Sequence, residues 1–432
     1  MKKEQSITEG VIWKQLLLFF FPIMLGSLFQ QLYSTVDAII VGRFVGKEAL
    51  AAIGNTGVFI NLLIGFFMGI SSGAGVVISQ YFGAKQDDQV SKGVHTSMVL
   101  AIGGGVIVMI IGILVAPAVL HMMNTPAEIF KQSYDYTKYY FYGAVPCLIY
   151  NIGAGILRAI GDSKRPLYFL IVACFSNIVL DYFFVVILDM GVIGAAIATD
   201  IAQVISAVLV VVYLMKAKEK SYQLFLNKLI VDFRLLKNII RIGVPIGIQA
   251  IMYTVSNMII QTYINGFGTN TIAAWPAYGR VDFLFWMIVN AMGISVTTFA
   301  GQNYGAGKLE RLKQGNITGL KMPAIVAIIL SAVYLIFAYP LLLLFTGDEK
   351  VLEIGVYMIR CFAPIYITFI PIESYSGTIK GAGTVMIPTL ITTLGVCGVR
   401  IVWLGAAMHW IPSLLTVMAA YPISWLIASA LY

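Results

Sequence analysis

Charged residues are scarce in this chain of 432 residues: Asp, Glu, Lys and Arg make up 11% of it, and hydrophobic residues make up 59%. An average soluble domain carries about 25% charged residues. The mean hydropathy of +0.88 points the same way. The composition therefore excludes a soluble globular protein and indicates a chain that crosses a membrane many times.

Cysteine and histidine are also scarce, with four and three residues. The cysteines lie inside apolar runs without a CxxC pair, which indicates small buried side chains rather than a disulfide or a metal site. His95, His121 and His409 stand alone near the ends of such runs. A membrane-embedded enzyme needs clustered histidines, paired acids or a nucleophile with its base, so this class is only a remote alternative. The cysteines are Cys147, Cys174, Cys361 and Cys397.

The chain carries a net charge of +8, but its basic residues follow the membrane topology. Most lie in the N-terminal tail or in alternate loops, with the densest groups in 216–241 and 308–321. This is the positive-inside pattern of membrane proteins. It places both termini in the cytoplasm and predicts no nucleic-acid partner.

Apolar runs long enough to cross roughly 30 Å of hydrocarbon recur along the whole chain. The first contains Pro22 and Asp37 and is too long for the core of a signal peptide. We predict an all-α polytopic protein with twelve spans near 15–44, 49–80, 93–119, 133–157, 166–188, 191–215, 236–265, 271–301, 316–345, 352–379, 386–407 and 412–432.

Two motifs of the first half return in the second half at one constant spacing. SQYFGAK (79–85) returns as GQNYGAG (301–307), and ILRAIGDSKRP (156–166) returns as TIKGAGTVMIP (378–388). Two six-span copies that enter the membrane in the same direction are related by a pseudo-two-fold axis along its normal. We predict an N-lobe at 1–215, a cytoplasmic linker at 216–235 and a C-lobe at 236–432. The linker is either solvated or an amphipathic segment on the membrane surface.

An acid interrupts the first span, in QQLYSTVDAIIVG (30–42). Ser27, Gln30, Ser34 and Asp37 follow one another at spacings of three and four, which puts them on one helical face. A charge at the bilayer centre costs about 2.5–3.5 kcal/mol on insertion scales. The polar stripe predicts a watery cavity beside Asp37; a hydrogen bond to a neighbouring helix is the alternative.

The fifth and sixth spans hold possible companions for this acid. SNIVLDYF (176–183) puts Asn177 and Asp181 on one face, and GAAIATDIAQ (194–203) adds Thr199 and Asp200. Two carboxylates, an amide and a hydroxyl form an all-oxygen set that suits a hard cation such as Na⁺. Two neighbouring carboxylates also hold a proton. For Asp200 we favour a place on the adjacent face, as a helix-packing or cavity-lining group.

The second half does not duplicate these acids, since the residues 222 positions after Asp37 and Asp181 are Ile259 and Trp403. Its main acid is Glu373, which either contacts cationic cargo or pairs near Lys380. Arg280 and Asp282 are expected to pair with other helices. The other candidates for a substrate cavity are Gln249, Tyr253, Asn257 and Tyr150.

These stretches together resemble the multidrug and toxic compound extrusion (MATE) family over essentially the whole chain. The resemblance lies in FFFPIMLGSLFQQLYSTVDAIIVG, GAGVVISQYFGAK, RAIGDSKRP, NIVLDYFFV, GVIGAAIATDIAQ and GQNYGAGK. It implies a monomeric antiporter in the plasma membrane of a bacterium, which expels amphipathic, often cationic compounds in exchange for Na⁺ or H⁺ and needs no other cofactor. The family often carries a basic tail after its last span, which implies a chain that continues beyond Tyr432.

The resemblance also implies roles for individual residues. In the DinF-like branch, the ion site uses positions that match Asp37, Asn177, Asp181 and Thr199, and Asn151 matches a further polar member. The NorM-like branch emphasises acids of the seventh and tenth spans, and the seventh span here has none, so the DinF-like branch is favoured. Gln30, Ser34 and Asp200 are expected to support this site. A flippase for lipid-linked saccharides has a similar architecture and is the alternative, although the arginines of the spans are scattered.

Overall fold

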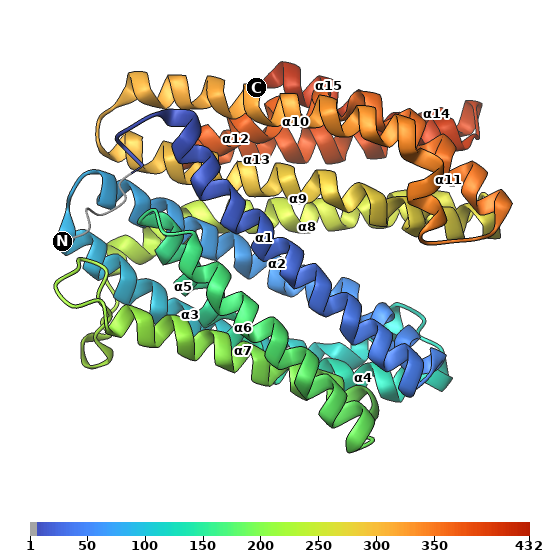
Figure 1. The fold of residues 1–432 in the computed structure, drawn as a ribbon, viewed down its shortest axis with the longest axis horizontal. Coiled ribbons are helices and arrows are strands. Elements are labelled where there is room, and N and C mark those ends of the chain that lie inside the picture. Colours follow the sequence, from blue (N-terminus) through green and yellow to red (C-terminus); the bar gives the residue numbers. More distant parts are fainter. Residues whose placement is uncertain (1–6) are drawn as a thin grey trace. The chain divides into compact units, whose positions relative to one another are not determined.

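A computed structural model describes residues 7–432 of the chain, and these residues form helices throughout (Figure 1). The elements are α1 (Ile12–Phe44), α2 (Lys47–Gly83), α3 (Asp87–Met122), α4 (Ala127–Tyr142), α5 (Ala144–Ala159), α6 (Lys164–Asp181), η1 (Tyr182–Ile187), α7 (Gly191–Met215), η2 (Leu226–Lys228), α8 (Phe233–Asn265), α9 (Thr269–Gly305), α10 (Leu309–Leu343), α11 (Glu349–Phe362), η3 (Ala363–Phe369), α12 (Ile370–Gly381), α13 (Met386–Leu390), η4 (Ile391–Gly398), α14 (Val399–Trp410) and α15 (Leu414–Leu431).

The helices confirm the predicted all-α architecture. Within residues 7–432, eleven helices are long and apolar enough to cross a membrane, and a bent pair, α4 and α5, supplies the twelfth span. The pair was predicted as one run, 133–157, but it bends by 49° at Gly143. Pro146 lies in the first turn of α5 and has no N–H to bond the carbonyl of Tyr142, which explains why the helix does not continue.

The internal repeat reappears in the bounds of the helices. Helix α2 runs from residue 47 to 83, and α9 runs from 269 to 305, which is 222 residues later at both ends. Helices α4 and α11 begin at residues 127 and 349, at the same spacing. The spacing of 222 residues between the short motifs of the two repeats therefore also holds for the bounds of whole helices.

The chain divides into two compact units. Unit 1 is built mainly from residues 21–250, and unit 2 from residues 9–20 and 251–432. Helices α1 and α8, which open the two repeats, thus each contribute to both units. Inside each unit the helices run alongside one another (Figure 1). The lobe boundaries at 215 and 236 stay predictions, and the first six residues of the N-lobe, with the N-terminus, lie outside the described residues.

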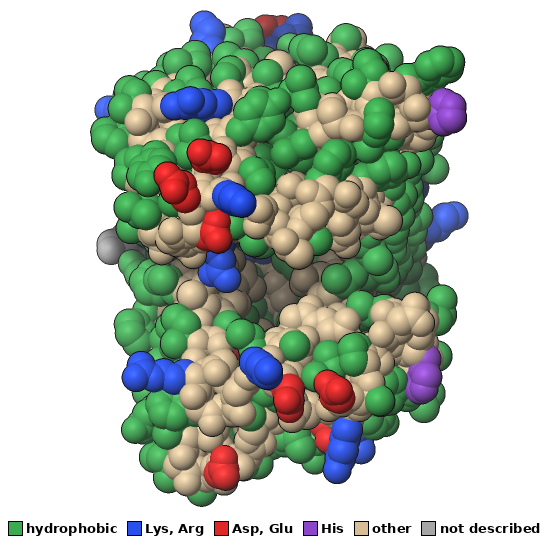
Figure 2. Space-filling model, turned by 90° about the vertical axis from the view of Figure 1, so that its right-hand side faces the viewer, with side chains coloured by type: hydrophobic (Ala, Val, Ile, Leu, Met, Phe, Trp, Pro, Cys, Tyr) green, Lys and Arg blue, Asp and Glu red, His purple; other side chains and the backbone are tan. Residues whose placement is uncertain are grey.

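The outer surface is largely apolar, as expected for contact with lipid. Large hydrophobic side chains such as Leu114, Met122 and Val402 are more than 70% exposed. The face in Figure 2 shows hydrophobic side chains around most of its rim and only scattered charged ones. Of the four free cysteines, Cys147, Cys174 and Cys397 are buried and Cys361 is half-buried, in agreement with their predicted packing role.

The segment before α8 differs from both predicted forms of the linker. Tyr222 and Leu224 are buried against side chains of α2, α3 and α5. The backbone N–H of Phe225 donates to Nε2 of His95 at 3.1 Å, and the N–H of Asp232 donates to Oγ1 of Thr96 at 3.1 Å. The linker is therefore docked on unit 1 through Tyr222 and Leu224, a contact that periodicity alone does not reveal.

Proteolysis tests this docking. We expect Leu224→Ser to speed trypsin cleavage after the exposed Lys218 and Lys228 in inverted membrane vesicles, because the anchoring side chain is removed from the core. Leu226→Ser is the matched control, since Leu226 is 53% exposed. Equal cleavage rates for the two variants on immunoblots would show that the linker is not held by Leu224.

Candidate functional site

Asp37 lies in the last third of α1 and is 8% exposed. Its Oδ1 is buried and accepts no hydrogen bond from residues 7–432. The predicted polar stripe before it is present, although Gln30 and Ser34 are exposed and Ser34 donates its hydroxyl to the Gln30 carbonyl at 3.1 Å. The alternative of a hydrogen bond to a neighbouring helix thus finds no support at Oδ1.

The fifth and sixth spans bring further oxygens together. Asn177 and Asp181 on α6 are 1% and 0% exposed, and Thr199 on α7 is 6% exposed. Nδ2 of Asn177 donates to Oγ1 of Thr199 at 3.4 Å. Oδ1 of Asn177 and both carboxylate oxygens of Asp181 are buried and have no partner among the described residues. Four acceptor atoms of this site, counting Oδ1 of Asp37, are therefore left without a donor.

The two acids belong to one site, because Asp37 interacts electrostatically with Asp181. Two tyrosines, whose place here was not predicted, join them. Tyr136 on α4 is 6% exposed and interacts electrostatically with both acids, and Tyr33 interacts with Asp37. Tyr33 precedes Asp37 by four residues and so shares its helical face. No sequence pattern marks Tyr136, because α4 is joined to the site only through the tertiary fold.

Two residues that were predicted to support this site, Asn151 and Asp200, have contacts of their own. Nδ2 of Asn151 donates to the Cys147 carbonyl at 2.8 Å, one turn back on its own helix. The carboxylate of Asp200 lies close to Gly143 at the bend between α4 and α5, since a Cβ atom on Gly143 would lie 2.0 Å from its Oδ1. This closeness fits the packing role, one of the two expected for Asp200, and the choice between packing and cavity lining stays a prediction. Asn151 also stays tied to its own helix.

The chemistry of the set suits a small cation or a proton. A buried polar group without a partner is rare in proteins and often marks a missing water or ion. Carboxylate, amide and hydroxyl oxygens are the donors that hard cations prefer. The set holds only two acids, and nowhere in residues 7–432 do three His, Cys, Asp or Glu side chains converge as for a transition metal. A π-helix, η1, starts directly after Asp181, and such segments occur frequently at functional sites.

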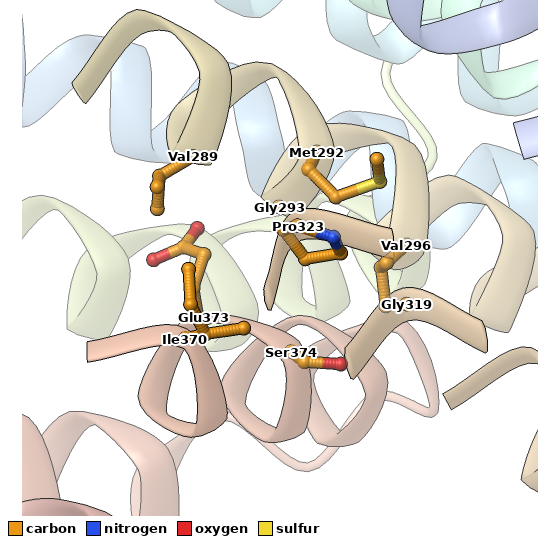
Figure 3. Close-up of a pocket in the computed structure, with 9 residues that line it drawn as sticks. All are labelled: Val289, Met292, Gly293, Val296, Gly319, Pro323, Ile370, Glu373 and Ser374. Carbon is orange, nitrogen blue, oxygen red and sulfur yellow. The ribbon is translucent and has the colours of Figure 1, made fainter. Parts of the chain in front are cut away.

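In unit 2, Glu373 points into a small cavity between α9, α10 and α12 (Figure 3). Helix α9 passes close to the carboxylate: a Cβ atom on Gly293 would lie 1.9 Å from its Oε1. Glu373 also interacts electrostatically with Lys380, as one of its two predicted roles requires. The cavity is lined by Val289, Met292, Gly293, Val296, Gly319, Pro323, Ile370, Glu373 and Ser374.

The other candidates for a substrate cavity are divided between the units. Gln249 and Tyr150 belong to unit 1, and Tyr253 and Asn257 to unit 2. The Tyr150 hydroxyl donates to the Pro166 carbonyl at 3.1 Å, and Asn257 is exposed. A shared cavity of these residues stays a prediction.

Comparison with known proteins decides the family. The MatE family model matches residues 22–183 and 245–404, one stretch in each repeat. The chain belongs to the MATE family. The probable multidrug resistance protein YoeA of Bacillus subtilis is 30% identical, with 98% of this chain and 96% of that protein covered. The multidrug export protein MepA of Staphylococcus saprophyticus is 24% identical, with 93% and 92% covered.

A solved structure supports the fold of this MATE transporter. The crystal structure of a MATE protein in the bent conformation matches with a TM-score of 0.92, covering 100% of this chain and 95% of that one, at 22% identity. Family membership confirms the prediction that the chain is a transporter and not an enzyme. The choice of the DinF-like branch stays a prediction.

Asp282 of this MATE protein forms the predicted contact between helices. Its carboxylate accepts Nε1 of Trp286 on the same helix at 2.7 Å and the hydroxyl of Tyr366 on η3. The ring of Tyr366 stacks on Phe285 with a centroid distance of 4.0 Å. Arg280, by contrast, is exposed. Asp282 is thus a satisfied acid in an aromatic core, unlike Asp37 and Asp181.

Proposed function

We propose that this MATE transporter exports amphipathic, often cationic compounds by alternating access, in exchange for H⁺ or Na⁺ bound at Asp37 and Asp181. Asn177 and Thr199 complete the ion site. The transporter acts as a monomer in the plasma membrane of a bacterium, with both termini in the cytoplasm. The names of YoeA and MepA, as multidrug resistance and export proteins, support drugs as the class of cargo.

The observation that carries this proposal is the state of the two acids. Both are buried, they interact with each other, and three of their four oxygens lack a hydrogen-bond donor in the described part of the chain. An ionised carboxylate without a partner is strongly destabilising inside a protein. A proton or a Na⁺ ion removes this penalty, so occupancy of the site changes which packing of the surrounding helices is stable.

Ion occupancy drives transport only if it favours one state of the transporter over the other. We infer that the ion favours the state that releases cargo outside, and that its loss to the cytoplasm restores the state that binds cargo inside. We infer that Tyr136 links the charge of the two acids to the position of α4, because this tyrosine of α4 interacts electrostatically with both of them. The same ion cannot bind equally to the two states, since equal affinity shifts no equilibrium.

Helix α1 is suited to follow such a change. Pro22 lies inside it, next to the point at residues 20 and 21 where the helix passes from unit 2 to unit 1. Proline removes a helical hydrogen bond and permits a kink. Similar solved MATE structures are described in bent and straight conformations. We infer that α1 bends at Pro22 when the site beside Asp37 changes its occupancy.

Transport in inverted vesicles tests the proposal and identifies the ion. We expect ethidium uptake into such vesicles when an outward gradient of the coupling ion is imposed, with the Na⁺ and pH gradients applied separately. An ionophore that collapses the gradient supporting uptake should stop the uptake of ethidium, because the coupling ion then no longer flows out of the vesicle. Uptake that is unaffected by either gradient would rule out ion-coupled antiport.

A further inference from the structure

Three cations lie on one exposed face of α8, at the end where this helix begins. Arg234, Lys237 and Arg241 follow one another at spacings of three and four residues, which puts them on one helical face. All three side chains belong to exposed residues. The residues 222 positions earlier, at the start of the first repeat, are Ile12, Gln15 and Phe19. The basic face is therefore a feature of α8 and not of the repeat.

Another face of α8 is fixed against α2, so the helix cannot turn to bury these cations. A Cβ atom on Gly243 would lie 2.5 Å from Cα of Ile70, and one on Gly247 would lie 2.6 Å from the carbonyl oxygen of Phe66. These residues all belong to unit 1. Glycines four residues apart let the backbones of membrane helices approach in this way. The contact sets the rotation of α8 and keeps the three cations on the outside.

Apolar side chains continue this face farther along the helix. Ile240 and Ile248 are 39% and 44% exposed, and Ile248 follows Arg241 by two helical turns. Helix α8 has 33 residues and is therefore about 50 Å long, whereas the hydrocarbon is roughly 30 Å thick. An excess of about 10 Å at each end places the first two turns at the level of the lipid headgroups. The cations thus lie at headgroup level, and the isoleucines lie against the acyl chains.

The described part of the chain pairs no acid with these cations. Within residues 7–432 the ion pairs lie elsewhere, and the side chains of the three cations make no hydrogen bond. Asp232, the acid directly before α8, caps the helix: its Oδ1 accepts the N–H of Arg234 at 2.9 Å and that of Leu235 at 3.0 Å. Three positive charges next to an apolar surface therefore fit a ligand that is anionic at one end and apolar at the other.

We propose that this face of α8 binds an anionic phospholipid of the cytoplasmic leaflet. The phosphate of the headgroup accepts charge-assisted hydrogen bonds from the arginines and the lysine, and an acyl chain packs on Ile240 and Ile248. Basic clusters at the cytoplasmic ends of membrane helices attract anionic headgroups in this way. A free phosphate lacks the apolar contact. The choice of leaflet rests on the proposed orientation, with both termini in the cytoplasm, whereas the lipid site itself does not.

Lipid binding to the purified full-length protein tests this site. The probe is phosphatidylglycerol, titrated into the protein in detergent and counted by native mass spectrometry, with phosphatidylcholine of the same chains as the reference. We expect the first phosphatidylglycerol to bind about 10-fold tighter than the first phosphatidylcholine, and added salt to reduce this preference. Equal affinities of the two lipids would overturn the proposal. So would displacement of the lipid by an equal concentration of glycerol 3-phosphate, which has no acyl chain.

Two triple variants with the same change of charge locate the preference. We expect Arg234→Gln, Lys237→Gln and Arg241→Gln together to weaken binding of phosphatidylglycerol about 10-fold and of phosphatidylcholine less than 2-fold, because only the anionic headgroup loses its partners. The matched control replaces with glutamine three exposed cations elsewhere in unit 1, namely Lys85, Lys216 and Lys218. The control should change neither affinity by more than about 2-fold. An equal loss in the two triple variants would show a general effect of charge and no site on α8.

Lipid binding and orientation are read separately. Labelling of Lys237→Cys with biotin-maleimide, in intact cells and in inverted vesicles, reports the side of the membrane on which α8 begins. If the label reaches this cysteine in intact cells while the lipid preference depends on α8, the proposed orientation and the leaflet are wrong and the lipid site stands. If the label reaches it only in inverted vesicles and phosphatidylglycerol is not preferred, the orientation stands and the lipid site is wrong.

Discussion

We expect Asp37→Asn to reduce drug efflux to the level of cells without the transporter, while the protein stays folded in the membrane. Asparagine has nearly the same shape as aspartate, but it carries no charge and releases no proton. Because Oδ1 of Asp37 has no hydrogen-bond donor among the described residues, the substitution breaks no contact at that atom. The loss of efflux would therefore come from the ion and not from packing. Ethidium efflux from expressing cells measures it.

Conservative and distant variants separate this effect from a loss of protein. Asp37→Glu keeps a carboxylate on a longer side chain, so we expect part of the efflux to return. Asp88→Asn removes an acid from an exposed surface pair with Lys92 and should leave efflux unchanged. Efflux of ethidium at the normal rate by Asp37→Asn, at equal protein levels on immunoblots, would exclude Asp37 from ion coupling.

The same reasoning extends to the second acid. Asp181→Asn should also abolish efflux, because both of its oxygens are buried without a partner in residues 7–432. The two acids form one site, so the double variant should lose no more than either single one. Residues that act as a unit show such non-additive effects. Additive partial losses in the two single variants would instead indicate two independent sites.

The membrane architecture was predictable because it depends on local properties of the sequence. Hydropathy alone locates spans, since every backbone polar group within lipid must be satisfied inside a helix. The constant shift of 222 residues then gave the repeat, which the paired bounds of α2 and α9 confirm. The bend at Gly143 was not predicted. Proline alone does not predict a break, since α1 and α8 continue through Pro22 and Pro245; the bend also depends on the tertiary packing around Gly143, where the Asp200 carboxylate lies close.

The candidate site was predictable only in part, for a related reason. Spacing on one helix indicates that Asn177 and Asp181 share a face, and the structure places their side chains with Thr199 and near Asp37. Contacts between distant segments leave no such mark. The approach of Tyr136 and the docking of Leu224 both depend on which helices become neighbours. In the sequence Arg400 is one of several scattered arginines of the spans, and only the fold places it beside the rings of Tyr421 and Trp425.

Gly105→Leu should prevent the transporter from folding to its native packing, because α3 receives the bent pair α4 and α5 at two glycines seven residues apart. A Cβ atom on Gly105 would lie 2.6 Å from Cα of Val145, and one on Gly112 would lie 2.5 Å from the ring of Phe141. The atom that this Cβ would meet on Val145 belongs to the backbone, so α5 itself would have to move away from α3.

Substitutions of increasing size at Gly105 measure how tightly α3 packs against the bent pair. Overpacking costs about 1–3 kcal/mol and occasionally more, and a shift of α4 would also displace Tyr136 from the acids. We expect Gly105→Leu to lower the yield of monodisperse protein and its thermal midpoint strongly, and Gly105→Ala to do so less, since alanine restores about 0.5–1 kcal/mol of helix preference over glycine. Gly103→Leu is the control, because nothing lies within 4 Å of a Cβ there and the residue is exposed. If Gly105→Leu and Gly103→Leu unfold at the same temperature, α3 does not fix the bend that brings Tyr136 to the ion site.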